Sequence, residues 1–247
     1  MTAPVPRLVT VRSDLDLAVR EAGEGGPVLV LHGAPGPAGI TPLVDHLATG
    51  HRVLAPTHPG WDDTARPDAL DSVAALAVAY LDLLDQRELD GVTVVGTSFG
   101  GWVAARMAVD DHAGRISRLV LMNAIGPEIP GHRVNLPSGP PPGIRTPAAR
   151  GGPPARMPTT LRAYTGPDLH DPGLLALLSA VTCPVLVIWG ADDTVVTPDF
   201  GRAYAAAFPS GRFQLIPGAG HLPIREEPGA VFTALDRFLT EPAEPAA

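Results

Sequence analysis

Short segments rich in Val, Leu and Ile recur along the chain, and no other feature of the sequence limits its fold as strongly. Such segments occupy residues 28–31, 52–55, 92–95, 119–122, 185–189 and 213–216. Strands that are apolar along their whole length belong to a sheet that is covered on both faces, which is the usual environment of parallel strands. The sequence therefore predicts a mostly parallel sheet.

Segments with helical periodicity lie between several of these strands. Apolar residues recur every three or four positions over residues 73–84, where Asp71 or Ser72 can cap the helix, and again over residues 231–239. Near the N-terminus, apolar and polar side chains alternate instead, which indicates an antiparallel hairpin at one edge of the sheet. Alternating strands and helices predict an α/β fold with helices on both faces of the sheet.

Residues 126–158 interrupt this alternation, because they are rich in Pro and Gly and have no sustained periodicity. Long insertions of this kind inside compact domains are usually lids or disordered segments. We therefore expect a core formed by residues 1–125 and 181–240, a short Pro/Gly-rich lid over residues 126–180, and a disordered tail over residues 241–247.

The composition narrows the classes of partner. The 247 residues carry a formal net charge of −8, so the surface repels phosphate groups and we expect no nucleic acid partner. No apolar run reaches the length of about 20 residues that a membrane-spanning helix needs, and no secretory signal is visible, so we expect a cytoplasmic protein without a membrane partner. The single cysteine, Cys183, excludes an intramolecular disulfide, and the sequence contains no recognisable metal or cofactor motif.

A Gly-x-Ser-x-Gly pattern centred on Ser98 carries the clearest chemical signal. It follows the expected strand 92–95 and precedes a helical stretch over residues 102–109, which is the context in which such a serine stands exposed at the top of a sheet. Gly96 and Gly100 leave the room that a sharp turn needs, and the start of the helix favours developing negative charge. The alternative is a glycine-rich turn with a capping serine. A dinucleotide-binding pattern is excluded, because Ser98 stands where a second glycine is needed.

Together with three other segments, this pattern resembles the α/β-hydrolase superfamily. The segments are residues 32–36 (His-Gly-Ala-Pro-Gly), residues 57–61 (Thr-His-Pro-Gly-Trp), and residues 190–196 taken with residues 218–221. The second of them departs from the Asp-x-Gly-x-Gly-x-Ser pattern of many relatives. The resemblance implies the α/β-hydrolase fold, with a mostly parallel eight-stranded sheet and a serine–acid–histidine triad, in that chain order, at the carboxyl ends of strands.

The triad that this resemblance implies consists of Ser98, Asp193 and His221. His221 lies in a glycine-flanked loop after residues 213–216, and a neutral imidazole there can accept the Ser98 proton near neutral pH. The Gly-x-x-Asp pattern of the superfamily matches Asp193, which would orient the imidazole, and Asp192 is the alternative acid.

The resemblance also implies an oxyanion hole formed by the backbone N–H groups of Ala34 and Phe99. Gly33, in the same loop as Ala34, would let the backbone approach a substrate. We expect His32, Gly33 and Trp61 to be candidate substrate-pocket residues, although His32 more often structures the loop, and Trp61 either walls the pocket or packs against its neighbours.

These features predict a serine hydrolase that cleaves a small, apolar carboxylic ester, thioester or lactone through an acyl-enzyme intermediate. The reaction needs no cofactor and no metal, and the expected partner is a small-molecule substrate. A carbon–carbon bond hydrolase, a perhydrolase or a lyase that uses the same triad is the alternative. A ligand-binding member of the fold without catalysis is a third hypothesis. The sequence leaves the oligomeric state open.

Overall fold

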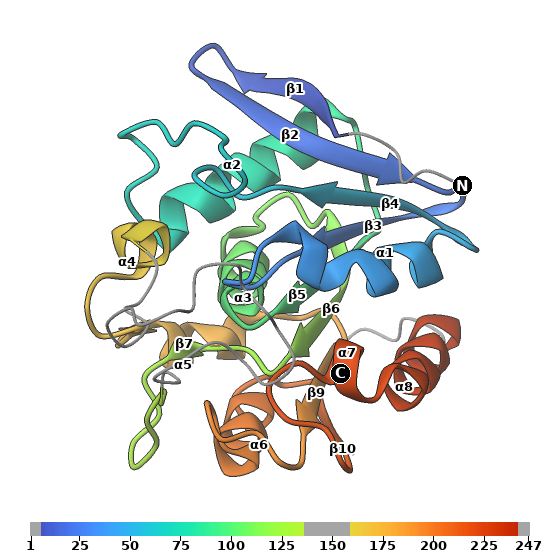
Figure 1. The fold of residues 1–247 in the computed structure, drawn as a ribbon, viewed down its shortest axis with the longest axis vertical. Helices are drawn as coiled ribbons and strands as arrows, with labels where there is room; N and C mark the ends of the chain where they lie inside the picture. Colours follow the sequence, from blue (N-terminus) through green and yellow to red (C-terminus); the bar gives the residue numbers. More distant parts are fainter. Residues whose placement is uncertain (1–5, 136–158, 242–247) are drawn as a thin grey trace, which may run out of the picture.

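The computed structural model describes residues 6–135 and 159–241, and Figure 1 shows how its elements are arranged. Its main sheet has eight strands in the order β1-β2-β4-β3-β5-β6-β9-β10. The strands are β1 (Arg7–Arg12), β2 (Leu15–Ala22), β3 (Gly26–Leu31), β4 (His51–Pro56), β5 (Val92–Thr97), β6 (Ile116–Met122), β9 (Val185–Gly190) and β10 (Gly211–Ile216). Every apolar segment singled out in the sequence lies within one of these strands.

The strand directions confirm a mostly parallel sheet with an antiparallel hairpin at one edge. Neighbouring strands from β4 through β3, β5, β6 and β9 to β10 are parallel, whereas β2 is antiparallel to both β4 and β1. The carboxyl ends of the parallel strands therefore meet at one edge of the sheet. Thr97, the last residue of β5, pairs with Met122, the last residue of β6, and Gly190 of β9 pairs with Ile216 of β10.

Helices cover both faces of the sheet, as predicted. They are α1 (Thr41–Leu47), α2 (Val73–Gln86), α3 (Phe99–Asp110), α4 (Thr159–Thr165), α5 (Leu174–Leu177), α6 (Pro198–Ala206), α7 (Pro223–Glu226) and α8 (Pro228–Thr240). Short 3₁₀ helices, Pro37–Ile40 and Leu178–Ala180, precede α1 and follow α5. Of the two candidate caps for α2, Ser72 serves, because its side chain accepts a hydrogen bond from the Ala75 N–H at 3.2 Å.

Each helix layer encloses its own apolar core. Alternate residues of β3 show the division, since Val28 and Val30 belong to one core, whereas Leu29 and Leu31 belong to the other. Helices α1, α7 and α8 contribute to the first core, and α2, α3 and α6 contribute to the second. The central strands are therefore buried on both faces, which explains why they are apolar along their length.

The expected lid falls partly outside the described residues, which exclude residues 136–158. The described parts of it contain α4, α5 and a small parallel pair formed by β7 (Gly126–Pro127) and β8 (His170–Asp171). The expected disordered tail also lies outside the described residues beyond Glu241. Within the described ranges, every helix is too short or too polar to cross a bilayer.

Two helical glycines predict opposite effects of the same substitution. A Cβ atom on Gly201 of α6 would lie 2.4 Å from the ring of Trp189 on β9, whereas a Cβ atom on Gly229 of α8 would meet nothing within 4 Å. We expect Gly201→Ala to lower the free energy of unfolding by about 1–3 kcal/mol through overpacking. Gly229→Ala should raise the free energy by about 0.4–1 kcal/mol, because it restricts the unfolded chain. Urea unfolding measures the free energy of unfolding of both variants. A change of the same sign in both would contradict the prediction.

Candidate functional site

The serine predicted from the glycine pattern occupies a strained turn between β5 and α3. Ser98 has φ 50° and ψ −116°, and it is 9% exposed. A Cβ atom on Gly96 would lie 2.3 Å from the carbonyl oxygen of Gly100, and one on Gly100 would lie 2.3 Å from the carbonyl oxygen of Leu31. These positions therefore accept only glycine without movement of the backbone, which is the steric reason for the pattern.

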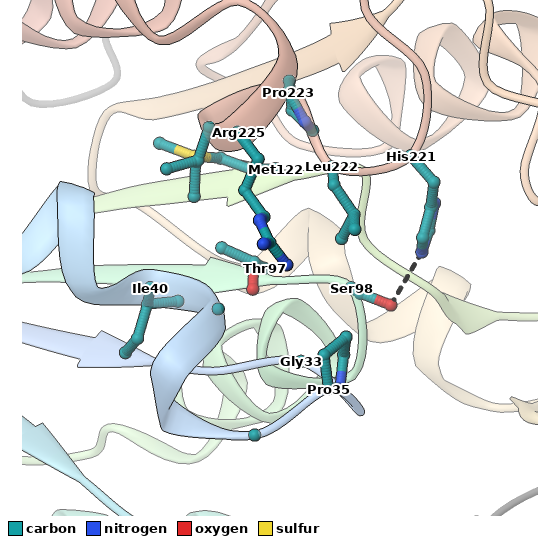
Figure 2. A pocket seen from close by; sticks show the side chains of 13 residues that line it. Gly33, Pro35, Ile40, Thr97, Ser98, Met122, His221, Leu222, Pro223 and Arg225 are labelled. Carbon is teal, nitrogen blue, oxygen red and sulfur yellow. Dashed lines mark hydrogen bonds between the residues drawn. The ribbon is translucent and has the colours of Figure 1, made fainter. Parts of the chain in front are cut away.

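Three side chains from separate loops form one hydrogen-bonded line. The Ser98 hydroxyl lies 3.0 Å from Nε2 of His221, as Figure 2 shows, and Nδ1 of His221 lies 2.9 Å from Oδ2 of Asp193. When Nδ1 donates to the carboxylate, Nε2 is left to accept the hydroxyl proton. The side chain of Asp193 is completely buried, whereas Asp192 is exposed. The structure thus brings the second of the two aspartates to the imidazole.

The Asp193 carboxylate is held by donors besides His221. Its Oδ1 accepts the N–H groups of Val195 at 2.8 Å and Val196 at 3.1 Å. Its Oδ2 accepts a hydrogen bond of 2.6 Å from the side-chain amide of Asn123, which is itself fully buried. Hydrogen bonds from several donors compensate a buried carboxylate for its lost contact with water and fix its orientation.

Asn123 is a site residue that the sequence reasoning missed. It directly follows β6, and its backbone has φ 45°, a left-handed conformation that asparagine tolerates better than most residues. Its amide also donates to the Gly220 carbonyl at 3.2 Å and accepts the Gly190 N–H at 3.3 Å. Asn123 therefore joins the loops that carry Asp193 and His221. The sequence offered one indication of this role, because Asn123 comes directly after an apolar strand, next to the strand that carries the serine.

The loop after β3 approaches Ser98 closely. A Cβ atom on Gly33 would lie 3.1 Å from the Ser98 Cβ and 3.1 Å from the Thr97 carbonyl oxygen. The backbone N–H groups of Ala34 and Phe99 have no hydrogen-bond acceptor within the described parts of the chain. They remain available to a negatively charged oxygen.

Two buried histidines shape this loop. Nε2 of His32 accepts the backbone N–H of His58 at 3.0 Å, so Nδ1 of His32 carries the proton and donates to the Gly33 carbonyl at 2.8 Å. Nε2 of His58 donates to the His32 carbonyl at 2.8 Å, which leaves Nδ1 to accept the Tyr80 hydroxyl at 2.5 Å. Every ring nitrogen is thus satisfied in a neutral tautomer.

Burial keeps both imidazoles uncharged. It lowers the pKa of His32 from 6.5 to about 4, although the bond to Gly33 opposes this shift. Burial also lowers the pKa of His58 well below its ordinary value, and the neighbouring His32 adds to the effect. The two residues act here as neutral hydrogen-bonding groups of the core.

Trp61 packs beside the same loop. Its indole N–H donates to the Ala34 carbonyl at 2.9 Å, and its ring stacks on Phe99 with the ring centres 5.5 Å apart. A pocket beside Ser98 is bordered by Gly33, whereas His32 and Trp61 are not among its lining residues. Of the three candidate pocket residues, Gly33 faces this pocket, and the other two support the loop.

The described residues contain no group of three or more His, Cys, Asp or Glu side chains arranged to hold a metal ion. A hydroxyl with a neutral base at 3.0 Å can act as a nucleophile. The adjacent free N–H groups can stabilise the negative charge that such an attack creates.

Comparisons with known proteins identify the family. The model of the alpha/beta hydrolase family matches residues 28–235, a range that includes Ser98, Asp193 and His221. An uncharacterized protein of Mycobacterium tuberculosis is 29% identical over 275 residues, which cover 92% of this chain and 80% of the relative. The 2-hydroxy-6-oxo-2,4-heptadienoate hydrolase of Pseudomonas putida is 35% identical over 133 residues, which cover 51% of this chain and 47% of the relative. A solved structure of a thermophilic esterase from Thermogutta terrifontis has a TM-score of 0.74 at 24% identity, covering 95% of this chain and 97% of that chain.

The neutral histidines predict a loss of stability in mild acid. The unfolded chain protonates His32 near pH 6.5, whereas the folded protein protonates it only near pH 4. The unfolded state therefore binds more protons within this window, and the free energy of unfolding falls as the pH is lowered through it. The shift of His32 alone corresponds to about 3 kcal/mol. Urea unfolding across the window measures the loss.

A histidine outside this cluster gives the control. His112 is exposed, so His112→Gln should leave the acid-induced loss unchanged. A free energy of unfolding that stays flat between these pH values, or a His32 ring that titrates near its ordinary pKa by NMR, would overturn the account.

Proposed function

We propose, since the chain belongs to the alpha/beta hydrolase family, that it is a serine hydrolase of a small, apolar carboxylic ester, thioester or lactone. The observation that carries the proposal is the hydrogen-bonded line from Ser98 through His221 to Asp193, with contacts of 3.0 and 2.9 Å. An unpolarised serine hydroxyl is a weak nucleophile, and an adjacent base whose second nitrogen is held by a carboxylate overcomes this weakness.

In the proposed mechanism, the Ser98 oxygen attacks the substrate carbonyl carbon while Nε2 of His221 takes the hydroxyl proton. The carbonyl oxygen becomes an oxyanion, and the N–H groups of Ala34 and Phe99 stabilise it. His221 then gives its proton to the departing oxygen or sulfur, which leaves an acyl group on Ser98. Water, deprotonated by His221, attacks that ester, and the serine hydroxyl is regenerated as the acid leaves.

The carboxylate of Asp193 has two tasks in this scheme. It keeps the proton of the neutral imidazole on Nδ1, and it stabilises the imidazolium that forms during the attack. Asn123 supports both tasks, because its hydrogen bond of 2.6 Å fixes the oxygen of Asp193 that contacts His221. We assign Asn123 the part of a positioning residue, since it touches neither the hydroxyl nor the site of attack.

We also propose that the described parts of the insertion, residues 126–135 and 159–180, belong to a lid over this site. The described part of that segment is tied to the loop after β4, because the Tyr164 hydroxyl donates to the Pro59 carbonyl at 3.0 Å and the Tyr164 ring stacks on Trp61. Trp61 in turn holds the Ala34 carbonyl. Contacts in the insertion are thus linked to one of the proposed oxyanion donors.

Carbon–carbon bond hydrolysis is a second candidate, and perhydrolysis or a lyase step belongs to the same group. It is favoured by the similarity of about half of the chain to the 2-hydroxy-6-oxo-2,4-heptadienoate hydrolase. The same serine, histidine and aspartate would serve either reaction. The ratio of kcat/KM for vinylogous diketones to kcat/KM for esters distinguishes the two.

Replacement of the nucleophile tests the proposal directly. Ser98→Ala should abolish covalent labelling by a fluorophosphonate and reduce turnover of p-nitrophenyl esters by roughly 10⁴-fold or more. The fold should persist, because only one oxygen is removed. Ser179 is exposed and distant from the site in sequence, so Ser179→Ala is the matched control. Undiminished labelling of the Ser98→Ala protein would remove the proposal.

The two neighbouring aspartates provide a second, paired test. Asp193→Asn keeps the shape of the side chain but removes the charge that stabilises the imidazolium, so kcat should fall by roughly 10⁴-fold. Asp192→Asn alters an exposed side chain and should leave kcat unchanged. Steady-state kinetics on one ester measures both variants. Equal losses, or a larger loss in Asp192→Asn, would show that the acid has been assigned to the wrong residue.

A further inference from the structure

The pocket beside Ser98 contains one permanent positive charge. One wall of the pocket comes from the loop and the 3₁₀ helix after β3. The other walls come from the strand ends at Thr97, Ser98 and Met122, and from residues 221–225. Arg225 of α7 contributes the only Lys or Arg side chain of this lining, and no Asp or Glu takes part in it. Apart from Arg225, His221 is the only side chain of the lining that can ionise near neutral pH.

The guanidinium group is directed into the pocket. Figure 2 shows the Arg225 side chain extending from α7 in the direction of Thr97, and Ser98 and His221 line the same pocket. The side chain is also exposed to solvent, so a molecule that enters the pocket can reach it.

Arg225 has no carboxylate partner among the described residues, and its guanidinium group has no hydrogen bond to them. Its sequence neighbour Glu226 forms no ion pair with it, and that carboxylate accepts the backbone N–H of Gly220 instead. Arg115 gives a contrast, since it contacts both Asp85 and Asp90. The positive charge of Arg225 is therefore available to a ligand.

A free guanidinium group beside a nucleophile selects for anions. Its fork of N–H groups matches the two oxygens of a carboxylate, and its charge persists at every physiological pH. The chain as a whole carries a net charge of −8, so its overall field repels anions. A local cation is then needed for a negatively charged substrate to be bound in the pocket rather than excluded from it.

We propose that Arg225 binds a carboxylate of the substrate, so that the preferred substrates are esters or thioesters that carry a carboxylate a few bonds from the scissile carbonyl. This inference rests on the proposed hydrolase function, and it replaces the apolar ester of that proposal with an anionic one. Half-esters of dicarboxylic acids belong to this class, and so do neutral acyl esters of hydroxy acids. The two differ in whether the carboxylate is on the acyl group or on the leaving group.

Two pairs of esters test the proposal. The mono-p-nitrophenyl ester of adipate is compared with p-nitrophenyl hexanoate, and 3-carboxyphenyl butyrate is compared with phenyl butyrate. In at least one pair, Arg225→Gln should lower the ratio of kcat/KM for the charged ester to kcat/KM for the neutral ester by about tenfold, the effect of losing a charge-assisted hydrogen bond. Arg225→Lys should restore part of the ratio, because it returns the charge without the fork.

The control is Arg202, which lies on α6, pairs with Asp199, and does not line the pocket. Arg202→Gln should leave both ratios at the wild-type values. If Arg225→Gln changes neither ratio, or changes both no more than Arg202→Gln does, Arg225 has no part in substrate recognition and the proposal is overturned.

A binding measurement separates this result from the proposed chemistry. Monomethyl adipate and dimethyl adipate are titrated into the Ser98→Ala protein by calorimetry, with and without Arg225→Gln. Tighter binding of the charged ester that is lost with Arg225→Gln supports the proposal, even if the wild-type protein hydrolyses none of the esters. Equal affinities for the two esters, or an unchanged preference in the double variant, would overturn it.

Discussion

The site depends on backbone segments that approach one another too closely for any side chain to lie between them. A Cβ atom on Gly100 would lie 2.3 Å from the carbonyl oxygen of Leu31, and one on Gly190 would lie 2.1 Å from that of Gly220. These contacts hold the turn after β5 against the end of β3, and the loop after β9 against the loop after β10. Because backbone meets backbone, the positions of the loops are determined by the sheet and vary little with side-chain rotamers.

On this scaffold, the polar groups are organised by charge state. The charged Asp193 is buried among hydrogen-bond donors, whereas His32 and His58 are buried as neutral rings. Asp193 orients the His221 imidazole, and the neutral rings support the loop that carries the Ala34 N–H. Every ring nitrogen and carboxylate oxygen of these groups has a hydrogen-bond partner. These hydrogen bonds offset the free-energy cost of burying polar groups close to the site.

Much of this arrangement is predictable from the sequence, and the reason is topological. Parallel strands bring their carboxyl ends to one edge, so the loops that carry Ser98, Asp193 and His221 are expected to meet wherever the strands are recognised. The choice of Asp193 over Asp192 comes from the Gly-x-x-Asp pattern of the superfamily, and the structure places the Asp193 carboxylate beside His221. Asn123 stands in no motif, and its contacts with Asp193 and Gly190 arise from the pairing of β6 with β9.

The remaining differences have similarly local causes. Helices α1 and α6 were not predicted, because α1 spans only seven residues and α6 contains a glycine that packs against Trp189. The part played by Trp61 was left open between wall and packing residue, and its hydrogen bond to Ala34 depends on a contact across 27 positions in the chain. Interactions between segments far apart in sequence leave no periodic trace.

His221, the proposed base, lies beyond the last strand at one edge of the sheet. The residue follows β10, which ends the strand order and is hydrogen-bonded to β9 on one side, and much of β10 is only half-buried. Marginal strands of this kind detach at a lower cost in free energy than central ones, often together with the helix that follows them. Fraying of β10 and α8 would carry the imidazole away from the hydroxyl while the central strands stayed intact. Gentle heating is then expected to abolish the proposed activity reversibly, well below the temperature at which the whole domain melts.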